Sequence, residues 1–391
     1  MQLIFWISIA IIIYTYLGYG IVISVLAKLK TTPAEQTEST ELPSVTLLVA
    51  AYNEEDIIEE KIQNSLMLSY PKDKLKIAFV TDGSNDQTVD IIKKYPELTL
   101  YHSSKRAGKI AAVNRVMKLI DTPITVFSDA NVMINEEGLE RLVGKFSNES
   151  TGAVSGEKVV ISSASDGASS SGEGFYWKYE SYLKKCDAKW NSLVGSAGEF
   201  FGIRTDLFET VDENTLIEDF VMTMQLASKG YKIDYAHDAI AAETGSLNIQ
   251  EETKRKVRIS AGGIQAVLKL THLLNPFIYG KLSFQYISHR VLRWTLIPLA
   301  IMTAFITNLF LIDHSSLLMF LFVAQMHFYA LALLGYAIRD KKTKIKLAYI
   351  PYYFLYMHYC VVLGWFKYFR GQQKVTWEKA KRATISEPTV S

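Results

Sequence analysis

The apolar residues of this chain are concentrated near its two ends, and this uneven placement limits the folds available to it. Residues 2–27 contain no charged side chain, and about 20 apolar residues in a helix are enough to cross a bilayer. A cleaved secretory signal has a basic start, a shorter apolar core and a small-residue cleavage site, none of which is clear in this segment. We therefore expect residues 1–30 to form a permanent transmembrane anchor.

Further apolar stretches lie near the other end of the chain. Residues 291–312 and 316–338 are each long enough to span a bilayer, with a short polar turn between them. Residues 347–369 are rich in tyrosine, which is enriched at membrane interfaces, so this stretch could span, re-enter or lie at the interface. We expect a C-terminal membrane region over residues 291–369 and a basic tail over residues 370–391.

The basic residues orient these segments. Lys28 and Lys30 follow the first apolar segment, and a basic run from Arg339 to Lys346 follows the third. Cytoplasmic loops carry an excess of Lys and Arg, so we expect a multi-pass protein of the inner (plasma) membrane with a cytosolic central domain. One conflict remains, because a spanning segment at 347–369 would leave the basic tail outside. Either that segment is a re-entrant hairpin or the tail breaks the rule.

The overall composition excludes several classes of protein. Lys and Arg number 42 against 40 Asp and Glu, so no global charge indicates nucleic-acid binding. The two cysteines, Cys186 and Cys360, are too few for a disulfide framework or a zinc site. Residues 162–174, SSASDGASSSGEG, lack apolar side chains to bury, and we expect them to form a mobile loop.

Residues 43–250 alternate between strand and helix patterns. The runs VTLLVAA at 45–51 and KIAFV at 76–80 are typical of strands buried in a parallel sheet. Between them, residues 57–68 place apolar side chains at helical spacing. The same alternation continues to an apolar run at 124–127. This order of elements predicts a nucleotide-binding type of α/β domain.

Acidic motifs adjoin the apolar runs of this domain. Asp82 and Asp129 each follow an expected strand, and open α/β sheets bind ligands at the carboxyl ends of their strands. Asp129 and Asn131, two residues apart, could together hold one Mg²⁺ or Mn²⁺. Each motif also has a plain structural explanation, such as a turn at Asp82 or a helix start at Glu218-Asp219. Their joint and ordered occurrence favours a single cleft lined by carboxylates.

Short motifs occur in a fixed order between residues 50 and 263. They are AAYNEE at 50–55, TDGSNDQT at 81–88, KRAGKIAAVN at 105–114, SDAN at 128–131, GEFFGIR at 198–204, IEDF at 217–220 and KRKVRISAGG at 254–263. Their order and spacing resemble those of the family 2 glycosyltransferases. The chain is similar to the membrane-integrated branch of that family, which includes cellulose, chitin, hyaluronan and poly-N-acetylglucosamine synthases.

The resemblance implies the fold of the central domain and its donor. It implies a GT-A domain over residues 43–250 that binds a nucleoside-diphosphate sugar, usually with uridine, and transfers the sugar with inversion at the anomeric carbon. By the same resemblance, Tyr52 and Glu54 would lie beside the nucleoside. Asp82 would contact the uracil or the ribose, and Lys109 would approach the diphosphate.

The resemblance also implies a divalent cation, Mg²⁺ or Mn²⁺, at Asp129 and Asn131. Asn131 stands where the usual motif of the family has a second Asp, and its amide oxygen can ligate a cation without supplying charge. Asp219 would take the proton of the acceptor hydroxyl, because an inverting transfer needs one base at that position. Glu218 would orient Asp219 or act directly.

Residues 251–290 are expected to form an interfacial amphipathic segment. Within it, Arg255 and Arg258 lie where processive relatives carry Gln-x-x-Arg-Trp. Arg258 could clamp a phosphate with two parallel hydrogen bonds, but Ile259 replaces the tryptophan, which leaves processivity open. Both arginines could instead belong to a solvated face or contact lipid headgroups.

These observations predict an inverting glycosyltransferase that moves a sugar from a UDP-sugar to a polysaccharide or a lipid-linked oligosaccharide at the cytosolic membrane face. A polyprenyl-phosphate glycosyltransferase is the alternative within the enzyme class. A non-catalytic, membrane-tethered nucleotide-binding protein is the alternative outside it. The sequence has no Walker phosphate loop and no Gly-x-Gly-x-x-Gly after its first strand, which argues against an ATPase or a Rossmann dehydrogenase. The residues identify neither the sugar nor an export partner.

Overall fold

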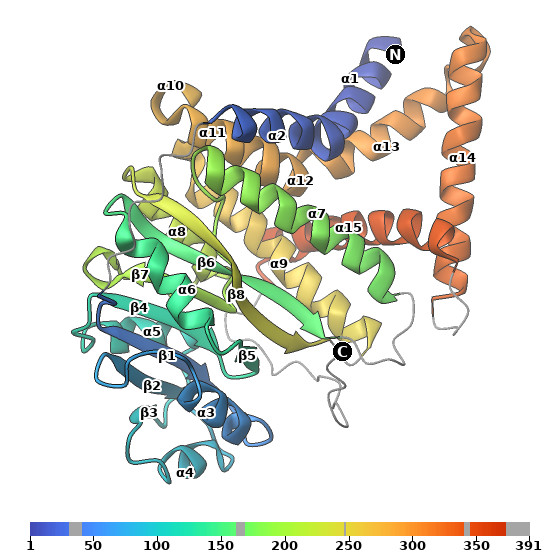
Figure 1. The fold of residues 1–391 in the computed structure, drawn as a ribbon. Coiled ribbons are helices and arrows are strands. Elements are labelled where there is room, and N and C mark those ends of the chain that lie inside the picture. Colours follow the sequence, from blue (N-terminus) through green and yellow to red (C-terminus); the bar gives the residue numbers. More distant parts are fainter. Residues whose placement is uncertain (31–40, 162–168, 246–247, 340–344, 373–391) are drawn as a thin grey trace.

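The computed structural model describes residues 1–30, 41–161, 169–245, 248–339 and 345–372. An α/β domain lies on one side of the molecule, and the apolar helices from both ends of the chain lie together on the other side (Figure 1). The α/β class expected from the sequence, with apolar helices before and after the domain, is therefore confirmed.

One eight-stranded mixed sheet forms the centre of the domain, in the order β3-β2-β1-β4-β7-β6-β8-β5. The first four strands in that order are parallel, whereas β7 runs antiparallel to both β4 and β6. The strands are β1 Val45–Ala51, β2 Leu75–Asp82, β3 Thr99–Ser103, β4 Ile124–Asp129, β5 Val132–Ile134, β6 Thr151–Ile161, β7 Phe200–Arg204 and β8 Lys232–Thr244.

The strand register brings two acidic motifs to the same edge of the sheet. Ala50 of β1 pairs with Asp129, the last residue of β4. On the other side of β1, Ala51 pairs with Thr81, which precedes Asp82 at the end of β2. The carboxyl end of β1 thus lies between Asp82 and Asp129.

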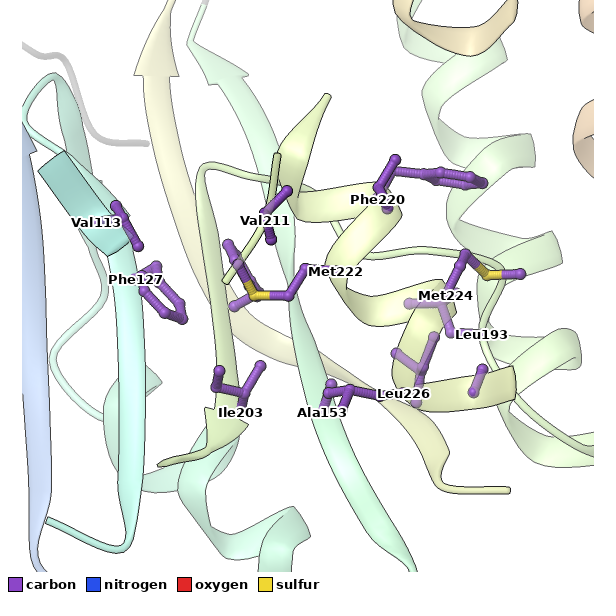
Figure 2. Packing of buried hydrophobic residues seen from close by; sticks show 14 of the residues in the cluster. Val113, Phe127, Ala153, Leu193, Ile203, Val211, Phe220, Met222, Met224 and Leu226 are labelled. Atoms are coloured by element: carbon purple, nitrogen blue, oxygen red, sulfur yellow. The ribbon is translucent and has the colours of Figure 1, made fainter. Parts of the chain in front are cut away.

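Helices cover both faces of the sheet and leave its strands buried. Alternate residues of β1 enter different cores: Leu48 belongs to one apolar cluster, and Leu47 and Val49 belong to the other. Helices α5 and α8 pack in the cluster of Leu48, part of which is drawn in Figure 2, and α3 and α6 pack in the second cluster. Burial on both faces explains why the strands read as unbroken apolar runs. The helices are α3 Ile58–Leu66, α4 Thr88–Ile92, α5 Lys109–Met117, α6 Gly138–Gly144 and α8 Glu218–Ser228.

Three helices among the described residues are long and apolar enough to cross a membrane: Gln2–Leu29, Ser316–Ala337 (α14) and Lys346–Phe369 (α15). The first consists of α1 (Gln2–Ile13), a π-helical turn and α2 (Tyr19–Leu29). The stretch expected at 291–312 is not one straight helix in the structure. It is divided between two helical segments, α12 and α13.

A bent helix pair contributes a fourth candidate span. Its halves, Lys281–Trp294 and Leu296–Leu309, meet at 57°. The first half contains α11 (Lys281–Tyr286) and α12 (Leu292–Trp294), and the second half is α13. The apolar end of α13 packs against α1, where both contribute to one buried cluster. Helix α10 (Pro276–Tyr279) precedes the pair.

Helix α7 (Ser169–Trp190) begins inside the segment that was expected to be a loop. Residues 169–174 form its first turns, so the prediction for 162–174 is wrong over that part, and 162–168 lie outside the described residues. Serine and glycine favour helix weakly, but later residues of α7, such as Leu183, pack in a buried cluster with α2. Tertiary packing of an amphipathic face supplies most helical stability in proteins.

A buried ionic cluster joins α7 to the bent helix pair. The Glu180 carboxylate of α7 accepts hydrogen bonds from Arg290 Nη1 at 2.7 Å and from Arg293 Nη1 at 2.8 Å. His289 lies between two acids of α7, with Nε2 3.1 Å from Glu180 and Nδ1 2.6 Å from Asp187. The second oxygen of Asp187 accepts a hydrogen bond from a tyrosine of α2. Both ends of the chain are thereby tied to one helix of the domain.

Candidate active site

An open cavity lies at the carboxyl ends of β1, β2 and β4. Its walls include the residues predicted to bind the donor and the cation: Tyr52, Glu54, Asp82, Lys109, Asp129 and Asn131. The other predicted site residues, Glu218, Asp219, Arg255 and Arg258, are not among the lining residues. Glu218 approaches the cavity through Lys109, whose Nζ lies 3.5 Å from Glu218 Oε1.

Asp82 organises the loop that leads into α5. Its carboxylate accepts hydrogen bonds from the backbone N–H groups of Ala107, at 3.0 Å, and Gly108, at 2.6 Å. Gly108 has φ of 107°, a conformation that L side chains rarely adopt. The turn after β2 also packs closely against this loop, since a Cβ on Gly83 would lie 2.6 Å from the Cβ of Arg106. Asp82 therefore fixes the loop that carries Arg106 and begins the helix of Lys109.

Arg106 is a lining residue that the sequence analysis did not single out. Its guanidinium carbon lies 3.8 Å from the ring centroid of Tyr52, and its Nη1 donates a hydrogen bond to the Tyr52 hydroxyl at 2.9 Å. The only available signal was its place inside the motif KRAGKIAAVN. Tyr52 and Arg106 together form a planar, cationic wall of the cavity.

Lys109 is held between two carboxylates. Its Nζ lies 2.6 Å from Asp129 Oδ1 and 3.5 Å from Glu218 Oε1. Burial by itself would lower the pKa of Lys109, but the carboxylates of Asp129 and Glu218 raise that pKa above its usual range. The lysine is therefore a fixed positive charge in the wall of the cavity.

Lys61 stabilises the turn that carries Asp129 and Asn131, and it does so from the buried side of that turn. The side chain is fully buried, and its Nζ donates hydrogen bonds to Ser128 Oγ at 2.8 Å and to the Val132 carbonyl at 2.7 Å. Burial lowers the pKa of Lys61 to about 7, and the nearby charge of Asp129 opposes that shift. The sequence contained a signal, since the helical spacing of α3 places this charged residue on its apolar face.

Asp219 lies in the first turn of α8, beside Glu218. Burial and the neighbouring carboxylate of Glu218 raise the pKa of Asp219 to about 7, and the positive charge of Lys109 opposes this shift. Space around the carboxyl group is tight, because a Cβ on Gly198 would lie 3.1 Å from the carboxyl carbon. A carboxyl group with a pKa near neutrality is suited to accept a proton during a reaction.

Helix α9 (Ile249–Lys269) carries the two predicted arginines, and the protein itself engages both of them. Arg255 lies 3.3 Å from Glu243 and 3.4 Å from Glu252, and Arg258 donates a hydrogen bond to a backbone carbonyl at 3.2 Å. The predicted contact between these arginines and a phosphate stays a prediction. The side chain of Asn248 caps the first turn of the helix by accepting hydrogen bonds from the backbone N–H groups of Gln250 and Glu251.

A buried network connects α9 to the cavity. Lys158 of β6 pairs with both Glu199 and Glu243. Glu243 also accepts a hydrogen bond from Asn131 Nδ2 at 3.5 Å. Burial raises the pKa of Glu199, but the adjacent charge of Lys158 outweighs burial and lowers that pKa to about 2. Neither Lys158 nor Glu199 was singled out in the sequence, because strand and loop patterns do not reveal which charges meet in space.

The residues at the predicted cation site have suitable ligand chemistry. Asp129 offers a carboxylate and Asn131 an amide oxygen on the wall of the same cavity, and hard divalent cations bind such oxygens. Within the described residues, no group of three or more His, Cys, Asp and Glu could hold a metal ion by itself. A cation at this position would therefore depend on further oxygens, such as those of a diphosphate.

Most of the α/β domain is similar to a known protein family. Residues 46–212 match the family described as Glycosyl transferase family 2. A poly-β-1,6-N-acetyl-D-glucosamine synthase of Staphylococcus aureus is 25% identical over 240 residues, covering 59% of this chain and 57% of the relative. A β-monoglucosyldiacylglycerol synthase of Trichormus variabilis is 26% identical over 249 residues, covering 60% of this chain and 52% of the relative. The match thus spans little more than half of the length of these relatives.

A solved structure has a similar fold over nearly the whole chain. It is a mannosyltransferase from Pyrobaculum calidifontis in complex with GDP-Man and Mn²⁺, with a TM-score of 0.69 and 21% sequence identity. The similarity covers 95% of this chain and 100% of that one. It extends beyond the α/β domain to the arrangement of the terminal helices.

Proposed function

Because the chain carries a glycosyl transferase family 2 domain, we propose that it is a membrane-bound, inverting glycosyltransferase that uses a UDP-sugar. Its acceptor is a polysaccharide or a lipid-linked oligosaccharide at the cytosolic face of the membrane. The observation that carries the proposal is the convergence of Tyr52, Asp82, Lys109 and Asp129 on one cavity, from loops that are far apart in the sequence.

The cavity supplies a separate environment for each part of a nucleotide sugar. The planar wall that Tyr52 and Arg106 form together suits stacking against a nucleobase. Lys109 lines the same cavity, and its positive charge suits a diphosphate. Asp129 and Asn131 would hold a Mg²⁺ or Mn²⁺ that neutralises the departing diphosphate. The similar mannosyltransferase binds GDP-Man with Mn²⁺, which supports this class of donor and cation.

Asp219 is the proposed base. In a single displacement, the acceptor hydroxyl oxygen forms the new bond to the anomeric carbon while the bond from that carbon to the diphosphate breaks. Asp219 takes the proton of the hydroxyl, and the bond electrons leave with the nucleoside diphosphate. With a pKa near 7, the Asp219 carboxyl group is partly deprotonated at neutral pH, and its carboxylate is still basic enough to take a proton. Glu218 keeps that pKa high through its negative charge.

The deciding experiment measures nucleotide release from the purified full chain in lipid, with Mn²⁺ or Mg²⁺ and a panel of UDP-sugars and GDP-sugars. Release of UDP with formation of a sugar product would support the proposal, and the size of the product would separate polymer synthesis from single transfer. Transfer to an extractable polyprenyl phosphate would favour that acceptor. If no donor were consumed while nucleotide still bound, the chain would be a nucleotide-binding protein and the proposal would be wrong.

A further inference from the structure

Asp129, the proposed cation ligand, is bound by a positive charge of the protein itself. Its Oδ1 lies 2.6 Å from Lys109 Nζ, a distance at which an ammonium and a carboxylate form a charge-assisted hydrogen bond. Only 19% of the Lys109 side chain and 17% of the Asp129 side chain are exposed, so salt screens this pair weakly. The carboxylate that a divalent cation needs therefore has a partner within the chain.

The motif around Asp129 supplies one negative charge for two positive ones. Asn131 stands two residues after Asp129 and contributes an uncharged amide, whose Nδ2 lies 3.5 Å from Glu243 Oε2. Like charges a few ångströms apart repel strongly where water is scarce. A divalent cation and the Lys109 ammonium would therefore compete for the Asp129 carboxylate.

Lys109 has a second carboxylate within reach. Its Nζ lies 3.5 Å from Glu218 Oε1, at the start of the helix that also carries Asp219. The backbone of Lys109 is held in place, because it follows Gly108, whose N–H donates a hydrogen bond to Asp82. The flexible four-carbon stem of a lysine allows the ammonium to move while the backbone stays. A shift from Asp129 toward Glu218 would keep the lysine paired.

The donor would give Lys109 a further partner in the same cavity. Lys109, Asp129 and Asn131 all line that cavity. The negative charge of a diphosphate attracts an ammonium group, and diphosphate oxygens can complete the coordination of a cation that Asp129 and Asn131 hold in part. With its ammonium on the diphosphate or on Glu218, Lys109 leaves the Asp129 carboxylate to the cation.

We propose that Lys109 is a counter-ion of Asp129 that competes with the divalent cation, so that the cation binds tightly only together with the donor diphosphate. The proposal rests on the proposed function, because it concerns the same cavity. Donor and cation then bind cooperatively, and each raises the affinity for the other by the same factor. Lys109 thus regulates when the site takes up its cation, in addition to attracting the diphosphate.

A simpler role for Lys109 leads to a different expectation. If the lysine only attracts the diphosphate, cooperativity between donor and cation comes entirely from the diphosphate oxygens that the cation binds. Removal of the lysine would then weaken nucleotide binding and leave the affinity for the cation alone unchanged. Binding of the cation without nucleotide therefore separates the two roles.

The experiment measures Mn²⁺ binding to the purified full chain in nanodiscs of phosphatidylcholine. The electron paramagnetic resonance signal of free Mn²⁺ gives the bound fraction, with and without UDP, and Asp129→Asn gives the background from other sites. The parent chain is compared with Lys109→Met, which keeps an apolar stem and removes the charge. Arg106→Gln is the matched control, because it removes one positive charge from the same cavity, where Arg106 stacks on Tyr52.

Without UDP, Lys109→Met should bind Mn²⁺ at least about tenfold more tightly than the parent, because close charge pairs contribute coupling energies of this size. The factor by which UDP improves Mn²⁺ binding should fall by a similar amount. Arg106→Gln should change the Mn²⁺ affinity without UDP by less than about threefold, since salt screens charges that are further apart. Equal Mn²⁺ affinities of the parent and Lys109→Met would overturn the proposal, and so would an equal rise in both variants.

Two further measurements keep the test decisive. If Lys109→Met does not purify as a folded chain, Lys109→Gln takes its place, because an amide can still donate a hydrogen bond to Asp129 without a charge, and the same rise is expected. A parent chain that binds no Mn²⁺ above the Asp129→Asn background, even with UDP, would contradict the cation site of the proposed function and this proposal with it. Mn²⁺ binding that requires UDP equally in the parent and in the lysine variants would contradict the counter-ion role alone.

Discussion

At the scale of single residues, Asp219 has the clearest chemical consequence. Its carboxyl group must be deprotonated to accept a proton, and its pKa is raised to about 7. The logarithm of kcat/KM, which reports the pKa of the free enzyme, should therefore fall with a slope of about one per pH unit below 7 and become constant above it. Asp219→Asn should reduce transfer to under a few per cent and leave nucleotide binding nearly unchanged. Measurement of UDP release against pH and of UDP affinity by calorimetry checks both expectations.

Glu218→Gln is the matched control for this assignment. It removes the negative charge that helps to raise the pKa of Asp219, so the inflection of the pH profile should move to lower pH. A profile that keeps its inflection near 7 in this variant would show that another group titrates.

Lys61 leads to a second residue-scale prediction. Lys61→Met removes the buried ammonium group that donates hydrogen bonds to the Ser128 hydroxyl and the Val132 carbonyl. Each group left without a hydrogen bond costs about 1–3 kcal/mol. The same change removes a buried charge, which offsets part of that cost. The affinity for the nucleotide-sugar donor should fall roughly tenfold, equivalent to about 1.4 kcal/mol, because the turn of Asp129 and Asn131 loses its support. Titration with UDP and Mn²⁺ measures the effect.

Asn64→Ala controls for a general loss of packing in α3. The Asn64 side chain exchanges two hydrogen bonds with the backbone of Ile134 in β5, one turn further along the same helix. The Asn64→Ala substitution should lower the free energy of unfolding without changing the affinity for the nucleotide-sugar donor. Equal losses of affinity in the two variants would mean that Lys61 acts only through stability.

At the scale of elements, the loop before β7 limits the position of the first turn of α8. Gly198→Ala would place a Cβ 3.1 Å from the carboxyl group of Asp219, a contact that requires the acid to move by a few tenths of an ångström. We expect kcat to fall about tenfold with unchanged donor affinity, because small misplacements of a reacting group are costly. The control is Gly144→Ala at the end of α6, where a Cβ meets no atom within 4 Å.

At the scale of the whole molecule, the ionic cluster around Glu180 couples the domain to the terminal helices. Glu180→Gln leaves Arg290 and Arg293 facing a neutral group. Removing one partner of a buried pair costs about 3–5 kcal/mol, so the Tm of the full chain in detergent should drop sharply. The double variant Glu180→Gln with Arg293→Gln should recover part of the loss, since the two residues are in contact. A double variant no more stable than the single one would contradict direct coupling.

Much of the fold could be predicted from local patterns of apolar residues in the sequence. Burial of β1, β2 and β4 on both faces required continuous apolar runs, so the strands and the acidic residues at their ends were visible in the sequence. Tyr52, Asp82, Lys109 and Asp129 line one cavity, because the carboxyl ends of parallel strands meet at one edge of the sheet, and their roles in that cavity stay predictions. The helical start of α7 was missed because packing against α2 overrides the weak propensity of its first residues.

The sequence by itself determined the α/β class, the apolar ends and the set of acidic residues, since periodicity and burial are local properties of a chain. Only the tertiary structure decided which charges face each other. It placed Lys61 behind the Asp129 turn, paired Lys158 with Glu199 and Glu243, and laid α15 along α9. The local sequence around a charged residue does not show which partner that residue will meet. The partner is set by packing between elements, which only the folded chain brings together.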